Sequence, residues 1–341
     1  MNPARFLARI AAPAVALVAV FSSPLAAQTN ELHARFDDAF GTEMRAPETF
    51  EAIYANSFEQ RIAELADGDQ GRIGVAALDL ATGEAITILG DQLFPMASTS
   101  KIAIAATYLE MVEQGRYSLT SEFPLLIPVR SAKFSSPAAP VREGNYMPAI
   151  DLIEIMITRS SNPATDALLA AVGGPEKVND WMRRQGINDF SIDRDIATLV
   201  RDDGEFDPAN WIDPRDSATP RAMVRLLEGL YRGDFLSDQS RYVLLGAMSR
   251  TVTGKRRIPA NMPEEARVSH KTGSLNNTSS DIGIIESPDG RAIAVAIYVT
   301  GQGTRLNRER RIAAIARALY DGFQARANQN RNWTSAPRSG G

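Results

Sequence analysis

The chain has 341 residues, of which 44% are hydrophobic and 23% charged, and its formal net charge is -4. It is long enough to bury a substantial core, and its composition and charge do not suggest a nucleic-acid-binding surface. It contains no cysteine, which excludes disulfides, thiol catalysis and cysteine-ligated zinc. Lysine is rare, with five lysines against 32 arginines, so the position of each lysine is informative.

The first 27 residues have the features of a secretory signal peptide. Arg5 and Arg9 precede an apolar run, and small residues end at Ala27. The run is interrupted by Pro13 and is shorter than the roughly 20 residues that span a bilayer. We therefore expect cleavage after residue 27, a periplasmic location, and no stable membrane span in the mature chain. Residues 28–56 are predicted to be a partly helical lead-in.

Helix and strand patterns follow the lead-in in a simple order. The predicted elements are a helix over 57–68, hairpin strands 72–80 and 84–90, helical segments between 98 and 248, strands 267–274 and 281–300, and a helix over 305–326. Several helical segments end at glycine, the usual residue after a helix C-terminus. The polar tail, 326–341, is predicted to be disordered.

Strands near both chain ends around a helical middle predict an α+β fold. We expect one antiparallel sheet built from both ends of a domain that covers residues 57–325. Its sheet lobe would comprise 57–97 and 251–325, and an all-helical lobe, 98–250, would be inserted between them. A cleft between two such lobes is a natural binding site.

The first candidate for chemistry is the stretch FPMASTSK, residues 94–101. On a helix that begins near Ser98, Lys101 shares a face with the serine, so the amine could take the proton of the hydroxyl. A desolvated ammonium can lose its proton, whereas a guanidinium effectively cannot. Ser98 as a simple helix N-cap is the alternative interpretation. The two histidines, His33 and His270, lie in no recognisable Ser-His-Asp context.

A second candidate is the stretch KTGS, at the start of a predicted late strand. The charge of Lys271 and the hydroxyls of Thr272 and Ser274 could receive a substrate carboxylate, and Gly273 would permit close backbone approach. A solvated strand end is the alternative.

A third candidate, RSSNPATDALL, lies between the other two. Ser160 and Asn162 could line the cleft, with Ser160 relaying a proton to a leaving group. Asn162, which precedes Pro163, also has the pattern of a helix N-cap.

In this order, S-x-x-K, S-x-N and K-T-G resemble the signature of class A β-lactamases and the related penicillin-binding D,D-peptidases. The resemblance extends across about residues 57 to 322. It implies a β-lactamase-like fold and β-lactam hydrolysis through a serine acyl-enzyme, without a metal or organic cofactor, in a monomer.

Two other functions stay open. The first is a D-alanyl-D-alanine peptidase or penicillin-binding protein that acts on peptidoglycan stem peptides. It is favoured by Ser161, which stands where class A enzymes usually carry aspartate. The second is a non-catalytic cell-wall-binding protein, although such a binder needs no paired serine and lysine.

The resemblance also implies a role for each motif residue. Ser98 would attack the carbonyl with help from Lys101, and the N–H groups of Ser98 and Ser274 would form the oxyanion hole. Ser160 would pass a proton to the departing nitrogen. The substrate-binding residues would be Asn162 for the side-chain amide, and Lys271, Thr272, Gly273, Ser274 and Arg257 around the carboxylate.

The loop before residue 216 departs from the family pattern. Class A enzymes carry R-x-E-x-x-L-N and a later R-D, and the first arginine pairs with the final aspartate. The stretch RDDGEFD fits this frame if Arg201 pairs with Asp216. Asp203 then replaces the glutamate that activates the deacylating water, and Asp207 replaces the asparagine. Because aspartate is one methylene shorter, we expect slow deacylation, with Glu205 as a substitute base if the register slips.

Overall fold

The computed structural model describes residues 56–335. The predicted signal peptide and residues 28–55 of the lead-in lie outside the described residues. The helices are α2 (Ser57–Ala66), α3 (Lys101–Glu113), α4 (Ala149–Thr158), α5 (Asn162–Val172), α6 (Pro175–Arg184), α7 (Ile196–Arg201), α8 (Pro220–Arg232), α9 (Asp238–Ser249) and α10 (Arg305–Ser335), with 3-10 turns η1 (Ala97–Ser100) and η2 (Ile258–Asn261). The strands are β1 (Ile73–Asp79), β2 (Ala85–Ile88), β3 (Phe94–Pro95), β4 (Glu122–Pro128), β5 (Val141–Pro148), β6 (Ser217–Ala218), β7 (Arg267–Leu275), β8 (Thr278–Glu286) and β9 (Ala292–Thr300).

The main sheet is antiparallel and is built from both ends of the described chain, as predicted. Its strand order is β2-β1-β9-β8-β7, so β1 pairs with β9 across more than 200 residues of sequence. β1 and β9 are buried along their whole length, which fits strands that are covered on both faces. The predicted α+β architecture is confirmed.

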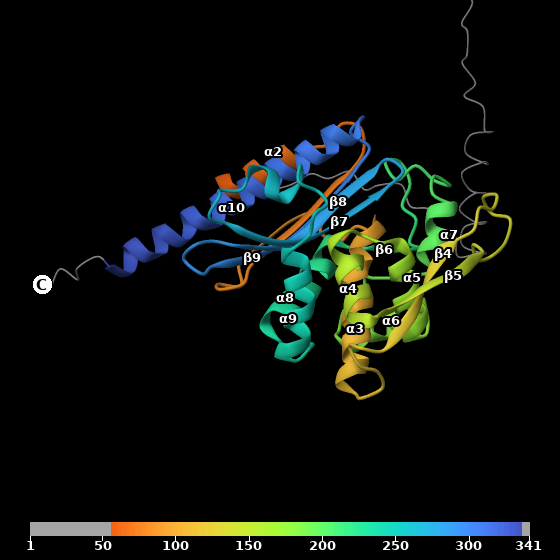
Figure 1. The fold of residues 1–341 in the computed structure, drawn as a ribbon. Helices are drawn as coiled ribbons and strands as arrows, with labels where there is room; N and C mark the ends of the chain where they lie inside the picture. The colour runs from red at the N-terminus through yellow and green to blue at the C-terminus, as the bar shows by residue number, and fades with distance from the viewer. Residues whose placement is uncertain (1–55, 336–341) are drawn as a thin grey trace, which may run out of the picture. The chain divides into compact units, whose positions relative to one another are not determined.

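Helices cover the two faces of this sheet. α2 and α10 pack together on one face, and the helical lobe, including α8 and α9, lies on the other (Figure 1). The described residues accordingly form two hydrophobic clusters, one on each side of the sheet.

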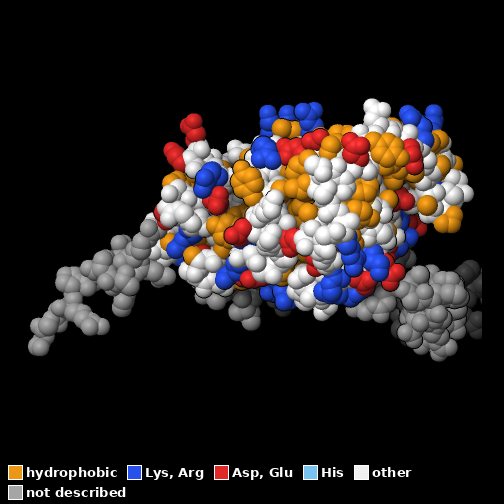
Figure 2. Space-filling view, turned by 60° about the horizontal axis from the view of Figure 1, so that its bottom comes forward, with side chains coloured by type: hydrophobic (Ala, Val, Ile, Leu, Met, Phe, Trp, Pro, Cys, Tyr) orange, Lys and Arg blue, Asp and Glu red, His pale blue; other side chains and the backbone are white. Residues whose placement is uncertain are grey.

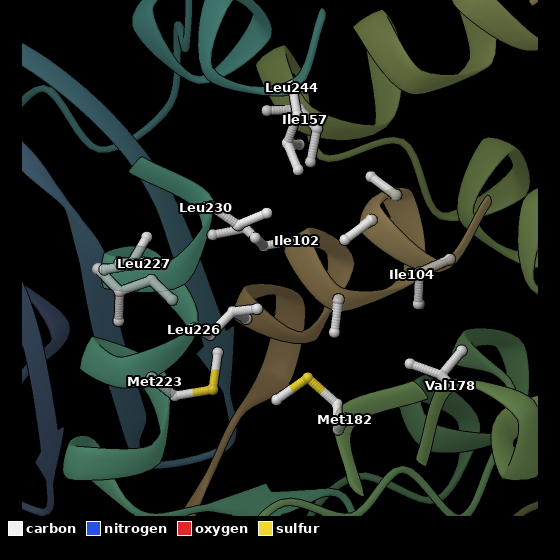
Figure 3. Packing of buried hydrophobic residues seen from close by; sticks show 14 of the residues in the cluster. Ile102, Ile104, Ile157, Val178, Met182, Met223, Leu226, Leu227, Leu230 and Leu244 are labelled. Atoms are coloured by element: carbon white, nitrogen blue, oxygen red, sulfur yellow. The ribbon is translucent and has the colours of Figure 1, made fainter. Parts of the chain in front are cut away.

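α3 lies at the centre of the helical lobe. All of its residues from Lys101 to Leu109 are buried, as expected for a helix that is surrounded by others. Figure 3 shows Ile102 and Ile104 of α3 facing side chains of α8 and α6, among them Leu226 and Met182. This packing fixes the start of α3, where the candidate nucleophile lies.

Two features of the fold differ from the prediction. The inserted lobe is not all-helical, because β4 and β5 form a two-stranded sheet within it. The apolar run of β4 contains Pro124 and Pro128, and it packs against α5. The last helix continues to Ser335, so residues 326–335 are helical rather than disordered.

Charged side chains of both signs are intermixed on the face that Figure 2 shows. Several charged residues of the described chain form ion pairs, such as Arg184 with Glu110 at 2.6 Å. Within residues 56–335, no helix has the length and apolar character needed to cross a membrane.

Candidate active site

Ser98 lies in a 3-10 turn between β3 and α3. Its hydroxyl does not cap the turn, because the N-cap is Met96 and makes no side-chain bond. The interpretation of Ser98 as an N-cap is therefore wrong, and α3 begins only at Lys101. Ala97 has a left-handed φ of 48°, a strained conformation that tends to occur at functional sites. At the start of a helical segment, the Ser98 N–H has no intrahelical acceptor.

The buried ammonium groups of Lys101 and Lys271 converge on Ser160. Lys101 Nζ donates to Ser160 Oγ at 3.2 Å, and Lys271 Nζ donates to the same oxygen at 3.0 Å. Lys101 also donates to the Ser160 carbonyl at 2.9 Å and to Asn162 Oδ1 at 2.7 Å. The three predicted motifs therefore meet at one point. The bonds of Lys101 run to the S-x-N motif, and none to Ser98 is found among the described contacts.

Burial makes both lysines easier to deprotonate. It lowers the pKa of Lys101 well below its ordinary value, and the like charge of Lys271 adds to the effect. Burial lowers the pKa of Lys271 to about 7, partly offset by the Asp281 carboxylate. Such shifts are typical of catalytic lysines. The site can therefore hold one lysine as a neutral base beside another that carries charge.

The start of α5 positions the S-x-N motif. The N-cap is Ser161, whose Oγ accepts from the Ala164 N–H at 3.4 Å. The prediction that Asn162 caps the helix is therefore wrong by one residue, and the Asn162 side chain is turned to Lys101 instead. Ser160 has a left-handed φ of 59°.

β7 approaches the Ser98 turn closely at Gly273. A Cβ on this glycine would lie 2.6 Å from the Met96 carbonyl oxygen and would also collide with Ser280 Oγ. The structure thus shows the close approach that we expected from a glycine here. Ser274 follows Gly273 directly and is exposed.

Arg257 is only 1% exposed and lies behind β7 rather than in the cleft. It donates to Ser274 Oγ at 2.6 Å and to the carbonyls of Gly273 and Ser280. Its counter-ion is Glu309, at 3.2 Å. Among the residues of the KTGS stretch, Arg257 therefore contacts the Ser274 hydroxyl and the Gly273 carbonyl.

The predicted ion pair between Arg201 and Asp216 is wrong. Arg201 pairs with its neighbour Asp202 at 2.7 Å, and Asp216 pairs with Arg194 at 2.6 Å. With Arg194 as first arginine, R-x-E-x-x-L-N falls on RDIATLV, residues 194–200. Leu199 then matches the leucine of the pattern, and Ile196 stands at the position of the glutamate.

The correction removes the basis for Asp203 and Asp207 as replacements in the deacylation machinery. Both Asp203 carboxylate oxygens accept from the Asn276 N–H, at 3.0 and 2.8 Å. Asp207 accepts from Asn277 Nδ2 at 2.8 Å and from the Ala209 N–H at 3.0 Å. Glu205, the substitute base, pairs with Arg215 at 2.7 Å.

Comparisons with known proteins agree with this geometry. The model of the β-lactamase enzyme family matches residues 57–323. The chain is 32% identical to β-lactamase CTX-M-8 of Citrobacter amalonaticus over 79% of this chain and 90% of that protein. The chain belongs to the class A β-lactamase family. As a member of this enzyme family, it is a β-lactam hydrolase.

Further relatives support the same assignment. β-Lactamase OXY-2 of Klebsiella oxytoca is 31% identical, with 80% of this chain and 92% of that protein covered. A solved β-lactamase from Chitinophaga pinensis superimposes with a TM-score of 0.69 at 28% identity, covering 79% of this chain and all of the other. A solved ancestral class A β-lactamase gives 0.67 at 34% identity, covering 78% of this chain and all of the other.

The sequence analysis did not predict two features of this region: the contacts of Asp166, and the alignment of the loop with the family pattern from Arg194. Asp166, on α5, is 3% exposed and accepts from the N–H groups of Ile196 and Ala197 at 2.7 and 2.9 Å. Burial raises its pKa to about 6. The sequence did contain a signal for the correct alignment. Counted from Arg194, the leucine of the pattern falls on Leu199, whereas counted from Arg201 it falls on Phe206.

Proposed function

We propose that this β-lactamase acylates readily on Ser98 and releases the acyl group slowly. In the first step the Ser98 oxygen attacks the lactam carbonyl, and its proton passes to neutral Lys101. The backbone N–H groups of Ser98 and Ser274 stabilise the oxyanion, a contribution often of about two to three decades in rate. The close approach at Gly273 and the lowered pKa of Lys101 support this step.

Collapse of the oxyanion breaks the C–N bond of the lactam. The departing nitrogen takes a proton from Ser160 Oγ, which is resupplied by one of the two lysines that donate to it. The product is an ester on Ser98. The substrate carboxylate would bind Lys271, Thr272 and Ser274, and the side-chain amide would bind Asn162.

Hydrolysis of that ester needs a base for water, and the observation that supports a slow step is the Arg194–Asp216 ion pair. This pair puts Ile196, whose side chain cannot accept a proton, where the family pattern carries glutamate. General-base catalysis contributes about 10²- to 10⁴-fold. We therefore infer a long-lived acyl-enzyme.

The test combines intact mass with turnover. Wild-type protein mixed with a chromogenic penicillin should gain one substrate mass within the mixing time and should then turn over slowly. Ser98→Ala should gain no mass. An adduct that survives in Ser98→Ala would overturn the assignment of the nucleophile.

A D-alanyl-D-alanine peptidase activity is a second candidate, favoured by Ser161 and by the loss of the glutamate. Release of D-alanine from a diacetyl-Lys-D-Ala-D-Ala peptide measures it directly. No release over hours, at an enzyme concentration that acylates fully with penicillin, would reject it.

We also propose that the chain is exported to the periplasm and acts as a monomer. The basic and apolar pattern of the first 27 residues supports export. The N-terminal sequence of the protein isolated from the producing cell tests the cleavage after Ala27, and sedimentation tests the oligomeric state.

A further inference from the structure

Behind the site, β7 and β8 enclose a buried histidine that the proposed reaction does not use. His270 is 3% exposed, and Asp281, on β8, is fully buried. We propose that these two residues form a pair that holds Lys271 in its charged form, which makes His270 a positioning residue for the substrate carboxylate. This inference rests on the proposed acylation of Ser98 and adds what controls the charge at the carboxylate site.

Two donors hold the Asp281 carboxylate. The His270 ring nitrogen Nδ1 lies 2.8 and 2.9 Å from its two oxygens, and the Ile258 N–H donates to Oδ2 at 3.1 Å. A carboxylate beside a ring nitrogen selects the tautomer in which that nitrogen carries the proton. The Nδ1–H of His270 therefore donates to the buried carboxylate, which would be costly to leave unpaired.

The backbone around the ring fixes its position. β7 and β8 lie side by side (Figure 1), and their register places Asp281 opposite Thr272 and Gly283 opposite His270. A Cβ on Gly283 would lie 2.7 Å from the His270 Cβ, so a side chain there would displace the histidine. The Thr251 hydroxyl donates to the His270 carbonyl at 2.8 Å. The ring is thus held against Asp281 by its backbone as well as by its own hydrogen bond.

The pair acts on Lys271 across the strand. Side chains alternate along a strand, so Lys271 points to the face of β7 opposite to His270. Burial lowers the pKa of Lys271 to about 7, the Asp281 carboxylate raises it, and the like charge of Arg257 lowers it. Because these groups are buried, salt screens their charges weakly. The negative charge of Asp281 therefore favours the ammonium form of Lys271.

Other charged groups lie on β7 and on the elements packed around it. Lys101 on α3 is the second ammonium of the site, and the like charges of Lys101 and Lys271 disfavour each other. Lys255 and Arg256, on the loop before η2, are exposed. The ion-paired arginines are Arg267 with Glu286, Arg250 with Glu154, Arg241 with Asp238, and Arg257 with Glu309.

Loss of the histidine should act on Lys271 through Asp281. Without the Nδ1 donor, the carboxylate keeps the Ile258 N–H of its two described donors, and a buried carboxylate that is poorly paired takes up a proton. The Lys271 ammonium then loses its favourable partner, so its pKa falls below about 7. The charge that binds the substrate carboxylate is therefore lost at a lower pH than in the wild-type protein.

The experiment measures second-order acylation rate constants from pH 5 to 9 for a penicillin and for its methyl ester. In the wild-type protein, the constant for the free acid should fall with a midpoint at about pH 7. We expect His270→Leu to lower this midpoint by about one pH unit, which lowers the constant at pH 7 about fivefold, and to change the constant for the ester less than about twofold. His270→Asn, whose Nδ2 replaces the Nδ1 donor, should restore the wild-type midpoint.

Two further variants separate this coupling from a structural effect. Asp281→Asn removes the charge itself, so its midpoint should shift at least as far as in His270→Leu. The double variant should shift no further than Asp281→Asn alone, because both changes break the same link. Thr251→Val is the matched control, since it removes the bond to the His270 carbonyl and keeps the ring, and it should have the wild-type midpoint.

A spectroscopic measurement tests the pair without a substitution in it. His33 is the other histidine of the sequence, so in His33→Gln the imidazole nitrogen resonances belong to His270. We expect Nδ1 to carry a proton at pH 7. An Nδ1 without a proton would overturn the pair.

The failures are distinguishable. If the penicillin does not acylate the wild-type protein, the proposed function fails. If it does, but the midpoint for the free acid is the same in His270→Leu as in wild type, or shifts equally in Thr251→Val, the pair does not control Lys271 and the proposed function stands.

Discussion

At the scale of single residues, we propose that Ile196 limits the release of the acyl group from Ser98. It is buried at the start of α7, and Asp166 holds its N–H in place. We expect Ile196→Glu to increase the deacylation rate constant by about tenfold or more, since a carboxylate there can act as base for water. Decay of the acyl-enzyme mass after rapid removal of free substrate measures this constant.

Ile196→Gln is the matched control, because glutamine has the same shape and is not a base. An equal gain in both variants would show that the change acts by loosening the loop. No gain in Ile196→Glu, in a protein that melts cooperatively, would contradict the register set by Arg194 and Asp216.

Lys271 should make carboxylate binding dependent on pH. Its pKa is lowered to about 7, so the ammonium loses its proton as the pH rises through that value, and the attraction for a substrate carboxylate is lost. We expect the second-order acylation constant of a penicillin to fall above pH 7. The constant for the methyl ester of the same penicillin, which lacks the carboxylate charge, should not show this fall.

A matched variant separates this charge effect from a pH effect on the fold. Lys271→Arg keeps its positive charge over the whole range, so its profile with the free acid should be flat from pH 7 to 9. The assignment would be rejected if the wild-type profiles for acid and ester were parallel.

At the scale of elements, the catalytic geometry depends on how closely β7 approaches η1. Gly273→Ala would place a methyl group 2.6 Å from the Met96 carbonyl oxygen, so the strand must move and carry the Ser274 N–H away from Ser98. We expect the acylation rate constant to fall about 10²-fold or more, the effect of losing one oxyanion-hole donor. Stopped-flow absorbance at saturating substrate measures it.

Gly246→Ala in α9 is the control, because its Cβ would meet only the flexible guanidinium of Arg250 at 3.3 Å. It should keep the wild-type rate constant. An unchanged constant in Gly273→Ala would mean that the Ser274 N–H is not part of the oxyanion hole.

At the scale of the described molecule, the sheet separates a chemical side from a supporting side. α2 and α10 cover the outer face, where Phe323 is fully buried and packs edge-on against Phe58 at 5.2 Å. We expect Phe323→Leu to lower the free energy of unfolding by about 1–2 kcal/mol and to leave acylation of the folded protein unchanged. Urea denaturation measures the free energy of unfolding, and the acylation rate constant of the folded protein measures the activity. A large loss of rate in fully folded protein would contradict this separation.

The sequence predicts those features of the fold that depend on residues close together in the chain, and it fails for features that depend on contacts between distant residues. Local patterns predict the hairpin of β1 and β2, the turn between β8 and β9, and α5 with its start near Asn162. The ordered motifs predict that Lys101, Ser160 and Lys271 lie together. The β4–β5 hairpin is stabilised by packing on α5, which no local pattern reveals.

The predicted alignment of the loop before residue 216 with the family pattern was wrong for a similar reason. Arg194 and Arg201 both precede an acidic residue and both fit part of the family pattern, so only the spatial pairing with Asp216 selects between them. Likewise, the sequence motif alone suggests that Arg257 faces the cleft, and only its ion pair with Glu309 of α10 shows that it lies behind β7.

The most direct test of the central claim is a rapid-mixing experiment with a chromogenic β-lactam in excess over the enzyme. We expect a burst of product whose amplitude equals the enzyme concentration, followed by a steady-state rate about 10²-fold or more slower than the burst. A linear release of product at the acylation rate, with no burst and no accumulated Ser98 adduct, would contradict the claim that the acyl-enzyme is long-lived.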